Sequence, residues 1–224
     1  MYRLEVIATN LAEAVAAQTG GAHSVEVCVD LAAGGLTPPL EVVRAIRDAV
    51  TIDINMMVRP HAESFYYSPH DIDLILQQAE AATSIGVTSI VFGALTSNRE
   101  VDAALVQQVK TAAGGLRLTF HRALDEAVNP TQGILALRGQ AERLLCSGGA
   151  PDIWQGREQM GRWVRQFGDQ FTFACAGGVT LANLPELVRI TGAPEYHVGS
   201  AARAQGVVQV ENVRALADVL QHIE

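Results

Sequence analysis

The chain has 224 residues, of which 49% are hydrophobic and 18% are charged, with a formal net charge of -8 and a sequence pI near 5.2. This acidic balance argues against nucleic-acid or anionic-membrane binding, because both need a basic surface that displaces counterions. The composition excludes a disordered chain, and no apolar run approaches the length of a membrane span.

The amino-terminal segment and the cysteines indicate the cellular compartment. Residues 1–10 have neither the apolar run nor the small-residue cleavage site of a secretory signal. The chain has three cysteines, Cys28, Cys146 and Cys175, and an odd number argues against a disulfide framework. We therefore expect a cytoplasmic protein with reduced thiols.

Short β-rich segments alternate with longer segments of helical period along the whole chain. The predicted strands are residues 2–8, 24–29, 52–58, 88–93, 116–122, 143–147, 171–176 and 195–199, and clear helical patterns cover residues 40–50, 71–85, 101–113, 155–167 and 210–223. Eight strand and helix units predict an all-parallel (β/α)₈ TIM barrel, with residues 1–224 as a single domain. An open doubly wound sheet is the alternative, but no glycine-rich dinucleotide fingerprint follows the first strand.

Local signals predict where two of the helices begin. Thr37 is placed to cap the second helix, with Pro38 at its first position. Ser68-Pro69-His70-Asp71 repeats the pattern, and Asp71 is placed for a capping interaction.

Polar residues fall on one face of several predicted strands. Residues two apart share a face, and this rule groups Glu5 with Ile7, Glu26 with Cys28, Thr119 with His121, Glu195 with His197, and Asp53 with Asn55, Met57 and Arg59. Buried charge is costly unless it is paired, so this set is either a satisfied ion-pair network or a functional site. The functional interpretation gains support because Arg59, His121, Arg122, Cys146, Ser147 and His197 lie at or near strand carboxyl ends, where barrel enzymes keep their active sites.

The loops after the strands suggest a lid and an anion site. Phe65-Tyr66-Tyr67 either covers the site or packs on the barrel rim. Loops after the last strands of a barrel often bind phosphate through backbone N–H groups, so the candidate anion-binding residues are Ser147, Gly148, Gly149, Gly177, Gly178, Gly199 and Ser200. The alternative is that these glycines only relieve crowding between strands and helices.

Several segments, in order along almost the whole chain, resemble those of the CutC family, which is named for copper homeostasis. They are Val25-Glu26-Val27-Cys28, Gly34-Gly35-Leu36-Thr37-Pro38, Met57-Val58-Arg59-Pro60, Val91-Phe92-Gly93, Thr119-Phe120-His121-Arg122-Ala123, Ser147-Gly148-Gly149 and Ala176-Gly177-Gly178-Val179. The resemblance implies a cytoplasmic barrel that self-associates and is linked by name to copper. It implies family positions at Glu5, Glu26, Cys28, Arg59, Thr119, His121, Arg122, Asp125 and His197. The chain departs from the family at residues 61–64, where the family has a basic residue and glycines, and at Cys146, where it has threonine.

Three functions remain open at this point. Copper(I) prefers thiolate and thioether ligands, and Cys28, Cys146 and Met57 are the candidate ligands, with His121 beside them. A lyase, isomerase or hydrolase acting on a small anionic or phosphorylated substrate would use Glu5, Glu26, Arg59, His121, Arg122, Asp125 and His197. The third possibility is a non-catalytic protein that acts by association.

Within the enzyme hypothesis the residues have different roles. His121 is the general acid or base, with Glu5 or Glu26 as its partner, while Arg59 and Arg122 hold the anion. The single lysine, Lys110, lies in a predicted helix, which disfavours a Schiff-base mechanism. No organic cofactor is indicated, and a homodimer is expected from apolar positions on the outer helices.

Overall fold

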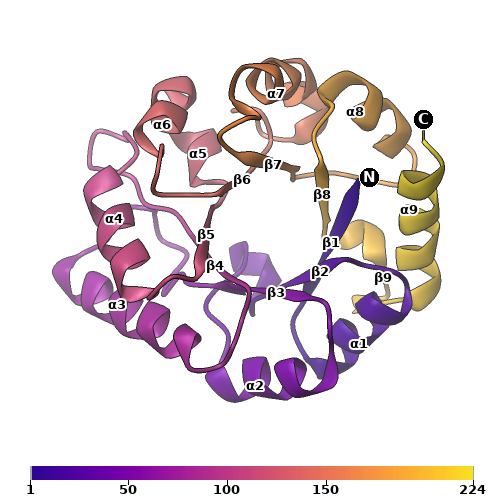
Figure 1. Ribbon diagram of the computed structural model, residues 1–224, viewed down its shortest axis with the longest axis horizontal. Coiled ribbons are helices and arrows are strands. Elements are labelled where there is room, and N and C mark those ends of the chain that lie inside the picture. Colours follow the sequence, from indigo (N-terminus) through magenta and orange to yellow (C-terminus); the bar gives the residue numbers. More distant parts are fainter. Residues whose placement is uncertain (1, 224) are drawn as a thin grey trace.

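Eight parallel strands close into one barrel in the computed structural model, which describes residues 2–223 (Figure 1). The strands are β1 (Arg3–Ala8), β2 (Ser24–Val27), β3 (Asp53–Met57), β4 (Ser89–Phe92), β5 (Arg117–Phe120), β6 (Arg143–Cys146), β7 (Thr172–Cys175) and β8 (Glu195–Val198). Each strand pairs with the next, and β8 pairs with β1 through Arg3 and Glu195. The predicted (β/α)₈ TIM barrel is confirmed. Residues 1 and 224 of the predicted domain lie outside the described residues.

Helices surround the barrel as an outer ring (Figure 1). They are α1 (Leu11–Thr19), α2 (Leu40–Ala49), α3 (Pro69–Thr83), α4 (Ala103–Ala112), α5 (Ala123–Glu126), α6 (Pro130–Ala136), α7 (Ile153–Phe167), α8 (Leu184–Thr191) and α9 (Val210–His222). Short 3₁₀ turns follow β2 (Leu31–Ala33) and β8 (Ser200–Ala202), and a small hairpin of β9 (Arg203–Ala204) and β10 (Val207–Val208) precedes α9. Between residues 2 and 223 no helix is long and apolar enough to cross a membrane.

Alternation along each strand separates an apolar outer face from a polar inner face. On β1, Leu4 and Val6 are fully buried in the main core between barrel and helices, whereas Glu5 points to the barrel interior. On β3, Ile54 and Met56 join the same core, and the alternating Asn55 reaches Glu5 inside the barrel. The predicted facing of these strands is confirmed, and it concentrates ionisable groups along the barrel axis.

The two predicted helix starts have different outcomes. Ser68 caps α3 in a capping box, since its hydroxyl accepts a bond from Asp71 N and the Asp71 carboxylate accepts one from Ser68 N. The predicted start at Thr37 and Pro38 is wrong, because α2 begins at Leu40. Pro39 disfavours helical geometry in the residue before it, so Pro38 cannot open the helix. Thr37 instead accepts a hydrogen bond from Arg59 N at 2.8 Å and ties the loops after β2 and β3 together.

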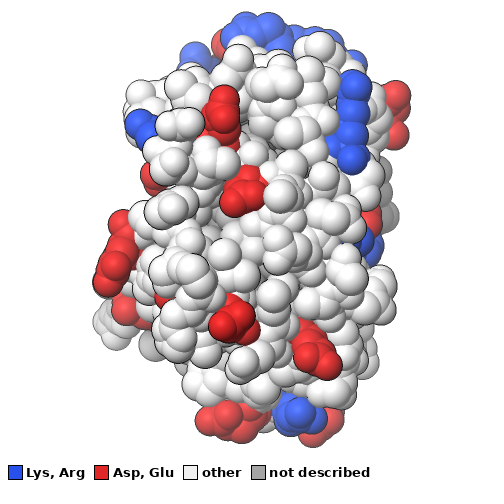
Figure 2. Space-filling model, turned by 90° about the vertical axis from the view of Figure 1, so that its left-hand side faces the viewer, with Lys and Arg blue, Asp and Glu red and all other residues white. Residues whose placement is uncertain are grey.

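The outer surface on the α3 and α4 side carries little charge. Figure 2 shows separate acidic side chains on a mostly uncharged face, with basic side chains near its edges, most of them toward the top. No broad basic stripe crosses this face, which agrees with the acidic composition.

Candidate active site at the carboxyl ends of the strands

A cavity of about 410 Å³ opens at the carboxyl ends of the strands and collects most of the predicted site residues. Its volume lies in the range of small-molecule sites. The predicted residues that line it are Glu26, Cys28, Met57, Arg59, His121, Arg122, Gly177, Gly178, His197, Gly199 and Ser200. The structure therefore joins the carboxyl ends of β2, β3, β5, β7 and β8 in one site.

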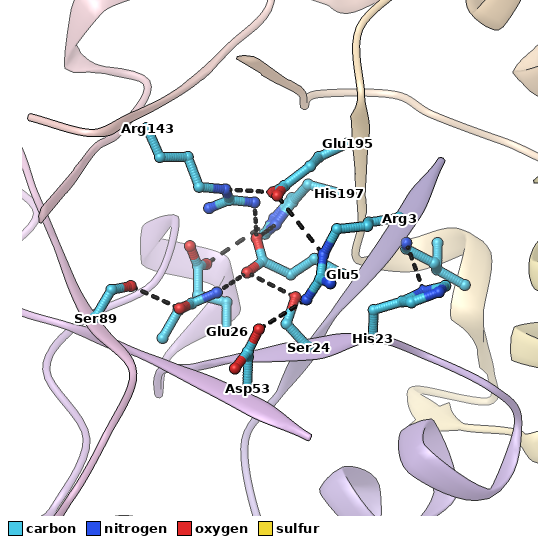
Figure 3. Close-up of polar contacts among 12 residues, drawn as sticks. Arg3, Glu5, His23, Ser24, Glu26, Asp53, Ser89, Arg143, Glu195 and His197 are labelled. Carbon is cyan, nitrogen blue, oxygen red and sulfur yellow. Dashed lines mark hydrogen bonds and ion pairs between the residues drawn. The ribbon is translucent and has the colours of Figure 1, made fainter. Parts of the chain in front are cut away.

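Glu5 lies beneath this cavity at the centre of a polar network (Figure 3). Its Oε1 is 2.8 Å from His197 Nδ1 and accepts a bond of 2.7 Å from Arg143 Nη2. Its Oε2 accepts bonds from Ser24 Oγ at 3.3 Å and from Asn55 Nδ2. Burial alone would raise the pKa of Glu5, but Arg143 and His197 outweigh burial and hold it far below the ordinary value. Glu5 is therefore a fixed anion and not a proton carrier at neutral pH.

Arg143 is a central residue that the sequence reasoning did not single out. Its Nε donates a hydrogen bond to Glu195 at 2.6 Å and its Nη2 donates one to Glu5, so one guanidinium joins two carboxylates. It also lines a second, polar cavity of about 200 Å³ toward the amino ends of the strands. Arg143 is two residues before Leu145, which lines the upper cavity, so the two share one face of β6, and this parity was the available signal.

His197 and Glu26 form the floor of the upper cavity. His197 Nε2 is 3.9 Å from Glu26 Oε1, and Glu26 Oε2 is buried with no hydrogen-bond partner among residues 2–223. Burial raises the pKa of Glu26 above its ordinary value. Burial alone would lower the pKa of His197, but Glu26 and Glu5 outweigh it and raise the pKa. Both shifts mean that the floor retains a proton more readily than isolated side chains do.

Glu5, Glu26 and His197 also offer ligand atoms within 4.8 Å of one another. Glu5, however, already accepts bonds from four neighbours, so it has little capacity left for a metal. Oxygen and imidazole donors also suit harder ions better than copper(I).

His121 contributes a neutral imidazole to the cavity wall. Its Nδ1 accepts a hydrogen bond of 3.2 Å from Ala123 N, so the ring proton resides on Nε2. Nε2 has no partner within the described chain. Burial, followed by the positive charges of Arg59 and Arg122, lowers the pKa of His121 to about 3. The absence of a side chain at Gly93 makes room for the His121 ring, because a Cβ there would lie 2.4 Å from His121 Nδ1.

Arg59 is a buried cation without an acidic partner. Its Nη1 donates to Ala33 O at 3.0 Å and Gly35 O at 3.4 Å, and its guanidinium lies 4.8 Å from the centre of the Phe65 ring. No carboxylate of residues 2–223 lies within 4.0 Å of its charged nitrogens, and its Nε has no partner. Carbonyl groups and an aromatic ring therefore surround its positive charge, but no carboxylate of the described residues neutralises it.

Only one residue of the predicted aromatic lid covers the site. Phe65 lines the cavity and packs against the His121 ring at 5.0 Å between centres. Tyr66 is exposed, whereas Tyr67 is buried and stacks on Phe92 at 6.0 Å. Phe65 thus covers the site, whereas Tyr67 packs on the barrel rim.

Asp125 organises the loop after β6. Its carboxylate accepts bonds of 2.9 Å from Ser147 N and Gly149 N and pairs with Arg122 Nε at 3.0 Å. Ser147, Gly148 and Gly149 do not line the upper cavity. A Cβ on Gly148 would lie 2.2 Å from Gly156 O, so this glycine permits close contact with α7. The structure thus brings only the loops after β7 and β8 of the predicted anion set to the cavity.

The three candidate copper ligands do not converge. Cys28 and Met57 line the cavity together, and a Cβ on Gly35 would lie 3.2 Å from Cys28 Sγ and 3.7 Å from Met57 Cε. Cys146 faces the opposite side of β6, where its Sγ is 3.8 Å from Met160 Sδ of α7. Expecting Cys146 to share a site with Cys28 is therefore wrong, because alternation turns its side chain outward. Burial raises the pKa of both thiols.

Comparisons with known proteins agree with this architecture. The model of the CutC family matches residues 2–202. Family proteins CutC from Histophilus somni and Mesorhizobium japonicum are each 34% identical, over 88% and 93% of this chain and 82% and 81% of their own lengths. The crystal structure of a CutC protein from Streptococcus agalactiae, named for copper homeostasis, has a TM-score of 0.84 and 26% identity, covering 89% of this chain and 99% of that one.

More distant structures share the fold alone. Phosphoribosylanthranilate isomerase from Thermotoga maritima has a TM-score of 0.66 at 13% identity, covering 99% of this chain and 100% of that one. The curated relatives, by contrast, are 34% identical to this chain, and the family model matches residues 2–202. The protein belongs to the CutC family.

Proposed function

We propose that this protein is an enzyme that performs acid–base chemistry on a small anionic substrate in the upper cavity. The observation that carries the proposal is Arg59, a buried cation with no carboxylate partner in the described chain, beside the unpartnered Nε2–H of His121. A buried charge is costly unless something compensates it, and an anionic ligand would supply that compensation.

The wall and the floor of the cavity offer complementary proton chemistry. His121 is neutral at physiological pH, so its Nε2–H can donate to a substrate oxygen on which negative charge develops. Across the cavity, Glu26 has a raised pKa and a free oxygen, which suits it to take a proton from the substrate and return it. Proton transfer with stabilisation of an oxyanion is the chemistry of isomerases and lyases.

Glu5 acts on this chemistry through His197. By accepting a hydrogen bond from Nδ1–H, the Glu5 carboxylate fixes the tautomer of the His197 ring and orients Nε2 toward Glu26. We assign Glu5 and Arg143 as positioning residues and Glu26 and His121 as the groups that touch substrate.

Ligand binding tests the proposal directly. Thermal shift and isothermal titration with small carboxylates and phosphate esters should identify anions that bind the wild type. Arg59→Gln should weaken such a ligand by about tenfold to a hundredfold, since a hydrogen bond to a charged group contributes about 1.5–3 kcal/mol. The matched control is Arg189→Gln, an exposed arginine on α8. A wild-type protein that no anion stabilises would contradict the proposal.

Copper(I) binding is the second candidate, favoured by the placement of Cys28 beside Met57 in the cavity wall. One thiol and one thioether supply the soft donors that copper(I) prefers, and the ion would be cargo of the protein.

We also propose that the protein is cytoplasmic, where its three unpaired cysteines stay reduced, and that it forms a homodimer.

A further inference from the structure

The upper cavity has opposite charge at its two ends. Arg59 and His121 present N–H donors and an uncompensated positive charge toward the mouth. Glu26 presents a carboxyl group at the floor, with Glu5 directly beneath it. A ligand that satisfied only one end would leave the other unpaired in a buried site.

The floor carries more carboxylates than cations. Arg143 is shared between Glu5 and Glu195, and Arg3 is shared between Glu195, at 3.8 Å, and Asp53, at 2.7 Å. Glu26 faces only His197, at 3.9 Å, and keeps one buried oxygen without a partner. Figure 3 shows these groups converging from β1, β2, β3, β6 and β8. Even with His197 protonated, the four carboxylates of this set outnumber its three cations and leave a net negative charge.

We infer that the substrate of the proposed enzyme is a small zwitterion, whose anionic group lies at Arg59 and His121 and whose ammonium group lies on Glu26. The inference rests on the proposed function and specifies its substrate class. A hydroxyl group could also donate to Glu26, but it would leave the excess negative charge of the floor in place. An ammonium group both donates and neutralises, which is what a buried carboxylate requires.

The cavity wall between the two ends favours a short carbon skeleton. Ile7, Cys28 and Met57 pack together on the wall, and Leu145 lines the cavity from a separate apolar cluster. In the register of β2 and β3, Glu26 is level with Asn55, four residues before Arg59. At about 3.3 Å per residue the two backbones are about 13 Å apart along the strand. The two long side chains span part of this distance, which leaves room for a few carbons.

Proton release gives the inference its own signature. Burial, followed by the charge of Glu5, raises the pKa of Glu26, while Glu26 and Glu5 outweigh burial and Arg143 and raise the pKa of His197, so the free floor favours a bound proton on one of these two groups. An ammonium group that takes this position makes the retained proton unnecessary, so it should leave for the buffer. Titration in buffers of different ionisation enthalpy measures the number of protons released.

The experiment compares matched ligands by isothermal titration at pH 7. The probes are ω-amino acids of two to six carbons, with the carboxylic acids and hydroxy acids of the same length. Phosphoethanolamine and ethyl phosphate repeat the comparison with phosphate as the anion. At one chain length the amine should bind at least tenfold tighter than both analogues and should release about one proton. Glu26→Gln should abolish this preference for the amine over the analogues of the same length.

The outcomes separate the inference from the proposed function. If simple anions bind through Arg59 but the amine adds no affinity and releases no proton, the zwitterion inference is wrong and the proposed function stands. If no probe binds, both are wrong. The control is Glu186→Gln, an exposed glutamate on α8, which should keep the wild-type preference. The comparison of ligands on the wild-type protein decides between these outcomes by itself. The inference can therefore be refuted even if the Glu26 variant fails to fold.

Discussion

The carboxylate of Glu5 fixes the ring of His197, with 2.8 Å between Oε1 and Nδ1. The same oxygen accepts from Arg143, so the amino-terminal strand holds both the last strand and the sixth strand through one atom. This arrangement couples the geometry of the site floor to closure of the barrel. A change at Glu5 should therefore affect both stability and the site.

Glu5→Gln should destabilise the protein by about 3 kcal/mol or more, because removing one partner of a buried ion pair leaves the other charge uncompensated. Urea denaturation at pH 7 measures the loss. Glu186→Gln, which removes an exposed pair with Arg189, should change stability by less than about 1 kcal/mol. Equal effects of the two changes would contradict a structural role for Glu5.

His121 should make the protein less stable as the pH falls below 6.5. The folded-state pKa is about 3, so between pH 6.5 and 3 the unfolded chain binds a proton that the folded chain does not. Stability therefore decreases with falling pH, by about 2 kcal/mol between pH 6.5 and 4.5 from this residue.

Comparison with His121→Asn isolates this contribution, since asparagine can still accept the bond from Ala123 N. Groups with a raised folded pKa, Glu26 and His197, act in the opposite direction and are present in both proteins. Urea midpoints measured at several pH values should show a shallower decrease for the variant. The exposed His70→Asn should keep the wild-type slope, and an identical slope for His121→Asn would refute the assignment.

Gly148→Ala should be much more harmful than Gly139→Ala. Both residues have a positive φ, 75° and 74°, so each substitution strains the backbone by about 1–2 kcal/mol. At Gly139 a Cβ meets nothing within 4 Å, whereas at Gly148 it lies 2.2 Å from Gly156 O. The overlap with backbone should add about 1–3 kcal/mol. Thermal denaturation of the two variants checks the difference, and equal losses would show that α7 moves aside freely.

Alternation and period were sufficient to predict the barrel and the inward set. Glu5, Glu26, Asn55 and His197 are inward as predicted, because parity along a strand is a local property of the chain. The sequence does not predict which of these residues line the cavity and which lie beneath it, because that depends on how far neighbouring strands are shifted along the barrel axis. Glu5 therefore lies beneath the cavity that Glu26 lines, although the sequence gives the two residues equal standing.

The errors arose where a segment passes from strand to loop. The position of Cys146 at a strand end predicts a site residue, but its side chain points to the face opposite Leu145 and contacts α7. Asp125 and the residues 147–149 form a loop network whose bonds join segments more than twenty residues apart. Long-range hydrogen bonds of this kind leave no periodic signal. Parity places Arg143 on the same face as Leu145, but its pairing with Glu5, 138 residues away along the chain, has no such signal.

The distinct environments of the cysteines give the copper hypothesis a sharp test. Reduced protein titrated with copper(I) against a competing chelator should lose at least tenfold in affinity with Cys28→Ser, and lose affinity again with Met57→Leu, because these two line the cavity. Cys146→Ser should have no effect, since its thiol is buried against Met160 on the far side of β6. Affinity that survives Cys28→Ser, or that depends on Cys146, would remove copper(I) from the upper cavity, leaving Cys28 as an apolar part of its wall.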